Sequence, residues 1–246
     1  MSLWRLEWLR LMRTKRFLII AGVYMLFGVL GPLTARYLPE ILERYGGGLE
    51  VVVPDPIPAD GITQFNANAQ QLGILAVVAV AGAALAFDAN REMSIFLRTR
   101  ATVTNIVRPR YVVNALGALV ALLLGAGLAL TGTWILLGSI PLDSFTVGIA
   151  LNALYLAFAV AVTALAASIV RTVPLTVLVT IGFLIVLGIL SIVPQVSEWL
   201  PSALPGSLDE LIRGAPFDYW PAVAITGAAT VLCLGLSVYF FRGREV

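Results

Sequence analysis

Long apolar runs alternate with short charged segments along this chain, and the pattern predicts its architecture. A helix needs about 20 mainly apolar residues to cross the hydrocarbon core of a bilayer. Six runs without a charged residue approach or exceed that length: Phe17–Ala35, Gly61–Phe87, Tyr111–Leu142, Ser144–Val170, Thr172–Ser197 and Tyr219–Phe241. The pattern predicts an all-α membrane protein whose residues 1–246 form a single transmembrane domain with six transmembrane helices.

Residues 1–16, before the first run, predict a helix that lies on the membrane surface. At helical spacing, the apolar residues Trp4, Trp8, Leu11 and Met12 share one side, and Glu7, Arg10 and Arg13 lie opposite. A positively charged flank without such a helix is the alternative. No small-residue cleavage signal follows the first run, so we expect that run to stay in the membrane rather than be removed as a signal peptide.

Two long connections are expected on the opposite, external side of the membrane. Residues 36–66 contain three consecutive glycines and three closely spaced prolines, which predict a loop with a short helix near Pro39–Tyr45. Residues 194–220 form a segment with short helices before the last span. Within it, Ser207 and Glu210 have the spacing of a capping box and predict a helix over Leu208–Arg213.

Residues 88–110 form the main connection on the same side as the N-terminus. Charged residues there are interleaved with apolar ones such as Phe96 and Leu97, and Pro109 predicts a break before the third span. Large apolar side chains in a charged loop are better explained by a protein partner than by water. A charged loop that only fixes the topology is the alternative.

The positions of the charges predict the orientation of the bundle. With the first segment placed in the cytoplasm, the cytoplasmic side receives 13 of the 16 basic residues and 4 of the 14 acidic ones. The basic residues outside are Arg36, Arg44 and Arg213. This asymmetry follows the positive-inside rule. It predicts a multi-pass protein of the plasma (inner) membrane with both termini in the cytoplasm.

Composition excludes several kinds of chemistry. Only 12% of the residues are charged and 59% are hydrophobic, too little polar surface to cover a soluble domain of this size. The chain has no histidine, one cysteine (Cys233) and one lysine (Lys15), and no glycines stand before Lys15 as a P-loop requires. We therefore expect no catalytic, metal or cofactor-binding residues and no nucleic-acid partner. Cys233 is expected to be an inert thiol in an apolar run.

The predicted spans carry no charged residue in their interior, which argues against proton coupling within this chain. Their polar residues are mostly expected to form hydrogen bonds between helices. Some of them are candidates for lining a path for an amphipathic substrate: Asn114, Thr131, Asn152 and Tyr155. An intramembrane enzyme is a weaker alternative, because the scattered Ser, Thr and Asn residues have no base beside them.

Taken together, these segments resemble the membrane subunit (permease) of an ABC-2 type ABC transporter. The resemblance rests on six spans, the helix before them, and an acidic residue followed by a basic and apolar stretch between the second and third spans, here Asp88–Arg100 and Ile106–Arg110. The segment 194–220 and the ending Phe240–Glu245 are also similar to the family. The preference for Arg over Lys, with abundant Ala, Gly and Val, is typical of a high-GC bacterium such as an actinobacterium.

The resemblance implies an ATP-driven exporter that moves a lipid, drug or peptide-like compound out of the cytoplasm. Two cytosolic ABC ATPase subunits would bind ATP and Mg, and a second permease, identical or related, would complete the core within membrane lipid. Contact with the ATPase is expected from Arg91, Glu92, Phe96, Leu97, Arg98 and Arg100. The alternative is a membrane assembly or sensory protein that docks a cytosolic partner without transport.

Overall fold

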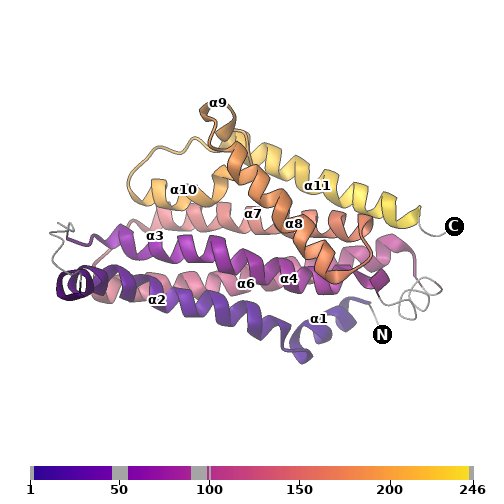
Figure 1. The fold of residues 1–246 in the computed structure, drawn as a ribbon, viewed down its shortest axis with the longest axis horizontal. Coiled ribbons are helices and arrows are strands. Elements are labelled where there is room, and N and C mark those ends of the chain that lie inside the picture. The colour runs from indigo at the N-terminus through magenta and orange to yellow at the C-terminus, as the bar shows by residue number, and fades with distance from the viewer. Residues whose placement is uncertain (1–2, 46–54, 90–98, 100, 244–246) are drawn as a thin grey trace.

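The computed structural model describes residues 3–45, 55–89, 99 and 101–243, and it is an all-α bundle (Figure 1). Six of its helical segments are long and apolar enough to cross a membrane, which confirms the predicted fold. They are α2 (Arg16–Tyr45), the segment made of α3 (Pro58–Asn68), η1 (Ala69–Gly73) and α4 (Ile74–Leu85), then α6 (Val103–Leu136), α7 (Leu142–Ile169), α8 (Val173–Leu190) and α11 (Trp220–Arg242).

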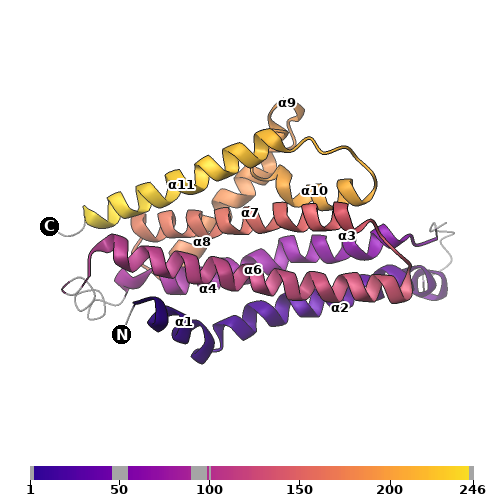
Figure 2. The same ribbon diagram turned by 180° about the vertical axis from the view of Figure 1, so that it is seen from behind.

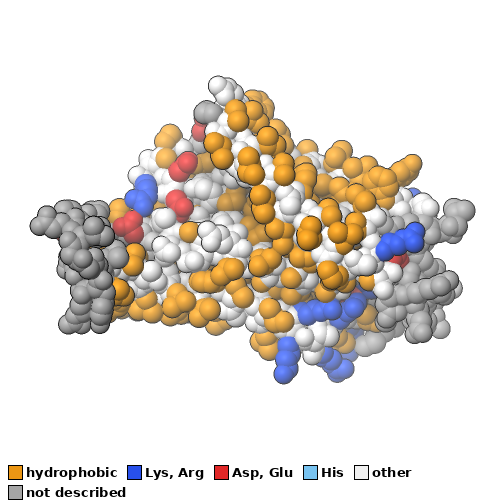
Figure 3. Space-filling model, viewed as in Figure 1, with side chains coloured by type: hydrophobic (Ala, Val, Ile, Leu, Met, Phe, Trp, Pro, Cys, Tyr) orange, Lys and Arg blue, Asp and Glu red, His pale blue; other side chains and the backbone are white. Residues whose placement is uncertain are grey.

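Helix α7 is the centre of the bundle, because it packs against α4, α6, α8, α10 (Ala203–Ile212) and α11. Helix α2 lies along α6, as both ribbon views show (Figures 1 and 2). Helices α8 and α11 bury little of their surface, and large apolar side chains such as Leu178 and Val231 cover their outer faces (Figure 3). These outer faces are suited to contact lipid tails or other apolar membrane segments.

The two ends of the bundle differ in charge. The basic end holds both termini, the start of α6, the turn between α7 and α8, and the end of α11 (Figures 1 and 3). The acidic end holds the start of α3, the start of α7 and helix α10, with carboxylates that include Asp60, Asp143, Asp209 and Glu210. The separation of charge along the long axis is what a helix bundle crossing a bilayer needs, since the apolar middle is left without exposed charge.

Glycines allow the backbones of neighbouring helices to come close to α6. A Cβ on Gly125 would lie 2.5 Å from the backbone oxygen of Tyr24 on α2, and one on Gly117 would lie 2.8 Å from Leu11 on α1 (Leu3–Arg13). Gly127, two residues from Gly125, faces open space. The α2–α6 contact therefore depends on particular glycines, as is common for helices packed in membranes.

Several helices extend further than the sequence predicted. Helix α2 runs on to Tyr45 through Pro32 and Pro39, so the expected short helix near Pro39–Tyr45 is the end of the first span. Helix α6 begins at Val103 and includes Pro109, so no break occurs there. A proline removes one backbone N–H and strains the turn before it. Tertiary packing outweighs that cost here, because Val103, Ile106, Val107 and Pro109 are all buried.

The helix of the second span begins at Pro58, before the predicted run Gly61–Phe87, so the predicted loop 36–66 is shorter. Polar residues mark its first half, α3, and a π-helical turn, η1, joins α3 to α4. A π turn inserts an extra residue into the helical ladder and often marks a functional site. It changes which side chains of this span face the centre of the bundle.

Helix α1 is present with its tryptophans outward, but two of its residues are buried where the sequence predicted exposure. Glu7 and Leu11 are buried against the bundle, whereas Trp4 and Trp8 are each 44% exposed. Lys15, with a φ of 58°, makes the sharp turn from which α1 folds back along α6. Glu7 is buried because it has a buried partner, which the pattern of a single helix cannot show.

The helix predicted over Leu208–Arg213 is also longer in the structure, where α10 spans Ala203–Ile212. Ser207 is inside it and donates a hydrogen bond to the Leu204 oxygen (2.6 Å), so Ser207 is not the N-cap. Leu204 and Leu208 are fully buried one turn apart, and Leu208 packs on Gly148 of α7. Burial of this apolar edge favours the earlier helix start and makes α10 a cap on the bundle.

Candidate functional site

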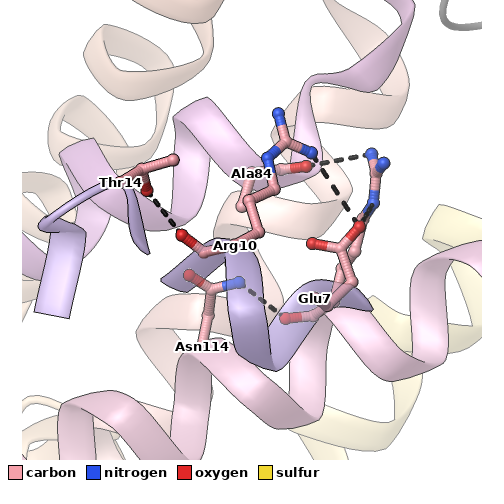
Figure 4. Close-up of polar contacts among 6 residues, drawn as sticks. Glu7, Arg10, Thr14, Ala84 and Asn114 are labelled. Carbon is pink, nitrogen blue, oxygen red and sulfur yellow. Dashed lines mark hydrogen bonds and ion pairs between the residues drawn. The ribbon is translucent and has the colours of Figure 1, made fainter. Parts of the chain in front are cut away.

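A buried ion pair joins helices α1 and α6 at the basic end. The Arg110 Nε donates to Glu7 Oε1 over 2.9 Å, and the two residues are 2% and 4% exposed (Figure 4). Arg10 lies 3.8 Å from the same Glu7 oxygen. Charges this well buried are costly to remove from water, so each depends on the other for compensation.

Arg110 also binds the last turn of α4. Its Nη1 donates to the Ala84 oxygen over 3.0 Å, and its guanidinium lies 4.9 Å from the centre of the Phe87 ring, in η2 (Phe87–Ala89). Phe87 in turn stacks on Phe241 of α11, with ring centres 4.8 Å apart. One side chain thus connects α1, α4, η2 and α6, and Phe87 extends the connection to α11. We call Glu7, Ala84, Phe87, Arg110 and Phe241 the Arg110 junction.

The residues expected to contact an ATPase, Arg91, Glu92, Phe96, Leu97, Arg98 and Arg100, lie outside the described residues. The described parts on both sides of them meet at the Arg110 junction. Ala84 and Phe87 come just before that segment, and Arg110 comes just after it. The elements that flank this segment are therefore held together by Arg110.

The predicted start of the third span needs correction at Arg110. The sequence placed the start of the third span at Tyr111, after the last arginine, and so left Arg110 in the connection. In the structure Arg110 is part of α6 and fully buried. The sequence gives little indication that Arg110 is buried. Its partner Glu7 is 103 residues away and lies on a helix of which one face is apolar.

A second polar cluster lies toward the acidic end, where α3, η1, α7 and α10 meet. Gln70, in the π turn, donates to the side-chain oxygens of Asn152 on α7 and Asn66 on α3, the latter over 3.4 Å. Asn66 Nδ2 donates to the Pro205 oxygen (2.8 Å) and to Asp209 Oδ2 (3.3 Å) on α10. We call Asn66, Gln70, Asn152 and Asp209 the polar network.

The structure does not bring the four predicted path residues together. Asn152 is in the polar network, and Tyr155 is buried one turn further along α7. Asn114 is buried at the basic end and donates to the Arg110 oxygen over 2.7 Å (Figure 4), while Thr131 is exposed and bonds back to Gly127 within α6. Asn66 and Gln70 were missed, although the polar run from Asn66 to Gln71 in an otherwise apolar stretch could have indicated them.

The Asp209 carboxyl differs from the other acids at this end. Burial raises the pKa of Asp209 to about 6, and the hydrogen bond from Asn66 lowers it only in part. The Oδ1 atom is buried without a hydrogen-bond donor in the part of the chain that the structure describes. The protonated form is therefore favoured by folding relative to an exposed carboxyl.

This pKa shift predicts a pH-dependent contribution to stability. Because the folded state raises the pKa from about 4 in the unfolded chain to about 6, the stabilising contribution of the proton is present at pH 4 and lost as pH rises through 6. Asp209→Asn should therefore raise the melting temperature at pH 7, and this gain should shrink toward pH 4. Thermal unfolding in detergent across this pH range measures it. A gain that is the same at pH 4 and pH 7 would contradict the assignment.

Neither cluster has the composition of a metal centre. Among the described residues, no three His, Cys, Asp or Glu side chains are grouped closely enough to hold a metal ion. The Arg110 junction can transmit a movement of one helix to its neighbours. The polar network offers amide and carboxyl hydrogen bonds inside an apolar bundle.

The chain is similar to the uncharacterized transmembrane protein YxlG of Bacillus subtilis (strain 168). The two are 21% identical over 252 residues, which cover 100% of this chain and 98% of the relative. No protein-family model and no solved structure matches the chain. The similarity along the whole length agrees with the six apolar helices, and the chain is a multi-pass membrane protein.

Proposed function

We propose that this chain is the permease subunit of an ATP-driven exporter of the ABC-2 type, located in the plasma membrane with both termini in the cytoplasm. Three features support the proposal: the six-helix bundle, the N-terminal helix α1 and the basic end that carries both termini. The positive-inside rule puts this basic end in the cytoplasm, where an ATPase would bind. Separate ATPase subunits would bind ATP and Mg.

The observation that carries the proposal is the Arg110 junction. An ATPase that closes on ATP must move membrane helices through the short segment that it touches. Here Arg110 holds the last turn of α4 and the start of α6, which flank residues 90–98, and it binds α1 through Glu7. A push on that segment would be transmitted to α1, α4 and α6 together, because close-packed interiors have low compressibility and transmit strain.

The polar network supports a path for an amphipathic compound. Gln70 in the π turn of the second span and Asn152 on α7 bond to each other, and their amides offer hydrogen-bond partners in an apolar setting. Two permeases, identical or related, would form a twelve-span core. Movement of α4 by the ATPase would displace η1 relative to α7 and alter these bonds. Export of a lipid, drug or peptide-like compound fits such a path.

Affinity purification of the tagged chain from its own host tests the proposal. We expect a P-loop ATPase to copurify in a constant ratio to the chain, and Phe96→Ser with Leu97→Ser to abolish that copurification. Leu178→Ser on the outer face of α8 is the control for an exposed apolar substitution away from residues 90–98. If no ATPase copurifies with the intact chain in a mild detergent, the proposed function is wrong.

A further inference from the structure

A groove at the basic end is not used by the proposed mechanism. It runs between the start of α1 and the start of α6 and has a volume of about 330 Å³. Its lining combines apolar and polar residues: Leu3, Trp4, Ala101, Asn105, Arg108 and Pro109. The groove lies beside α1, the helix predicted to lie on the membrane surface.

Two arginines give this region positive charge. Arg108 is exposed and makes no ion pair or hydrogen bond within the part of the chain that the structure describes. Arg242 of α11 donates to Thr104 Oγ1 over 3.1 Å, one helical turn before Arg108 on α6. Residues four apart on a helix are neighbours on its surface, so both guanidinium groups lie on one side of α6. Glu7 is buried and paired with Arg110.

The side of α1 next to the groove is apolar and aromatic. Trp4 lines the groove, and both Trp4 and Trp8 are 44% exposed. Tryptophans favour the boundary between headgroups and hydrocarbon. A molecule bound in the groove would thus contact the cationic and hydrogen-bonding side chains of Arg108 and Asn105. It would also contact an aromatic side chain at the lipid boundary.

We propose that this groove binds the headgroup of an anionic phospholipid, with its phosphate at Arg108 and Asn105 and its glycerol and acyl chains along Trp4. Basic pockets at the ends of membrane helices recognise lipid phosphates through the same charge complementarity. A free phosphate would satisfy Arg108 but would leave the aromatic side of the groove unfilled. This inference does not depend on the proposed transport function.

Lipid titration of the purified, delipidated chain, followed by native mass spectrometry, tests the site. The probes are dioleoylphosphatidylglycerol and its zwitterionic counterpart dioleoylphosphatidylcholine. We expect preferential binding of phosphatidylglycerol, weakened about fivefold in Arg108→Gln. Arg242→Gln should weaken it less, because Arg242 lies beside the groove and does not line it. Arg171→Gln, an exposed arginine at the same end between α7 and α8, should leave this binding unchanged.

Three results would overturn the inference. If the Arg108→Gln and Arg171→Gln variants bind phosphatidylglycerol equally well, the groove is not the lipid-binding site. Full displacement of the lipid by excess inorganic phosphate would identify a site for a free anion. Unchanged lipid binding with loss of a copurifying protein would identify the groove as part of a protein interface. Gel filtration of each variant establishes that it remains folded.

Discussion

Substitution of Arg110 by glutamine should lower the free energy of unfolding by about 3–5 kcal/mol, the largest effect that we expect from one residue. The variant leaves the Glu7 carboxylate buried without its 2.9 Å partner, and it also removes the donor to the Ala84 oxygen. Unfolding by SDS in mixed micelles, followed by tryptophan fluorescence, measures the loss. Arg171→Gln, exposed at the same end, should change stability by no more than about 0.5 kcal/mol.

A double variant distinguishes the contribution of the ion pair to stability from that of side-chain packing. In Glu7→Leu with Arg110→Met, no charge and no polar side chain is left unpaired at these two positions, so most of the lost stability should return. If Arg110→Gln lowers the free energy of unfolding no more than Arg171→Gln does, the buried Glu7 carboxylate does not need Arg110 to compensate its charge. If the double variant is as unstable as the single one, the shape of the arginine matters and the charge does not.

Addition of one methyl group at Gly125 should destabilise the bundle by about 1–3 kcal/mol, toward the upper end of that range. The new Cβ would lie 2.5 Å from the backbone oxygen of Tyr24, and a backbone atom cannot move aside as a flexible side chain can. Helices α2 and α6 would have to separate along their contact. The same SDS unfolding measurement applies.

Gly127→Ala provides a matched control on the same helix. Its Cβ would meet nothing within 4 Å, and alanine has the better helix propensity, so we expect a neutral or slightly stabilising effect. Equal effects of the two substitutions would mean that the close α2–α6 approach does not contribute to stability.

The number and order of the spans could be predicted because the bilayer imposes a length on each apolar run. Six runs gave six helices. The helix ends were predicted less well, as Pro39 and Pro109 show. Proline was taken as a boundary, but packing on neighbouring helices holds α2 and α6 through both positions.

Which face of a helix points inward could not be predicted for α1. In a membrane protein both the lipid-facing side and the packed side of a helix are apolar, so periodicity alone does not tell them apart. Trp4 and Trp8 face outward, as the predicted membrane anchor requires, whereas Leu11 of the same predicted side is buried against the bundle. Glu7 faces inward because Arg110 is there, and that pairing joins parts of the chain that are far apart in sequence.

The candidate site could be predicted only in part for the same reason. Asn152 was named as a candidate for the substrate path, and the structure buries it in the bundle. Its partner Gln70 depends on the π turn, which shifts the register of the second span. The segment with Phe96 and Leu97 remains a prediction from sequence. The Arg110 junction adds what that prediction lacked, a physical link from this segment into three helices.

ATP-dependent uptake by inverted membrane vesicles tests the central claim most directly. The vesicles would contain this chain together with the ATPase that copurifies with it, and the probes would be a fluorescent phospholipid, a cationic dye and a labelled peptide. Our account predicts that at least one probe accumulates with ATP, does not accumulate with a non-hydrolysable analogue, and is lost with Arg110→Gln under conditions where that variant stays folded. A bound ATPase with no ATP-dependent uptake of any of these probes would contradict it and would favour a membrane assembly protein that docks a partner without transport.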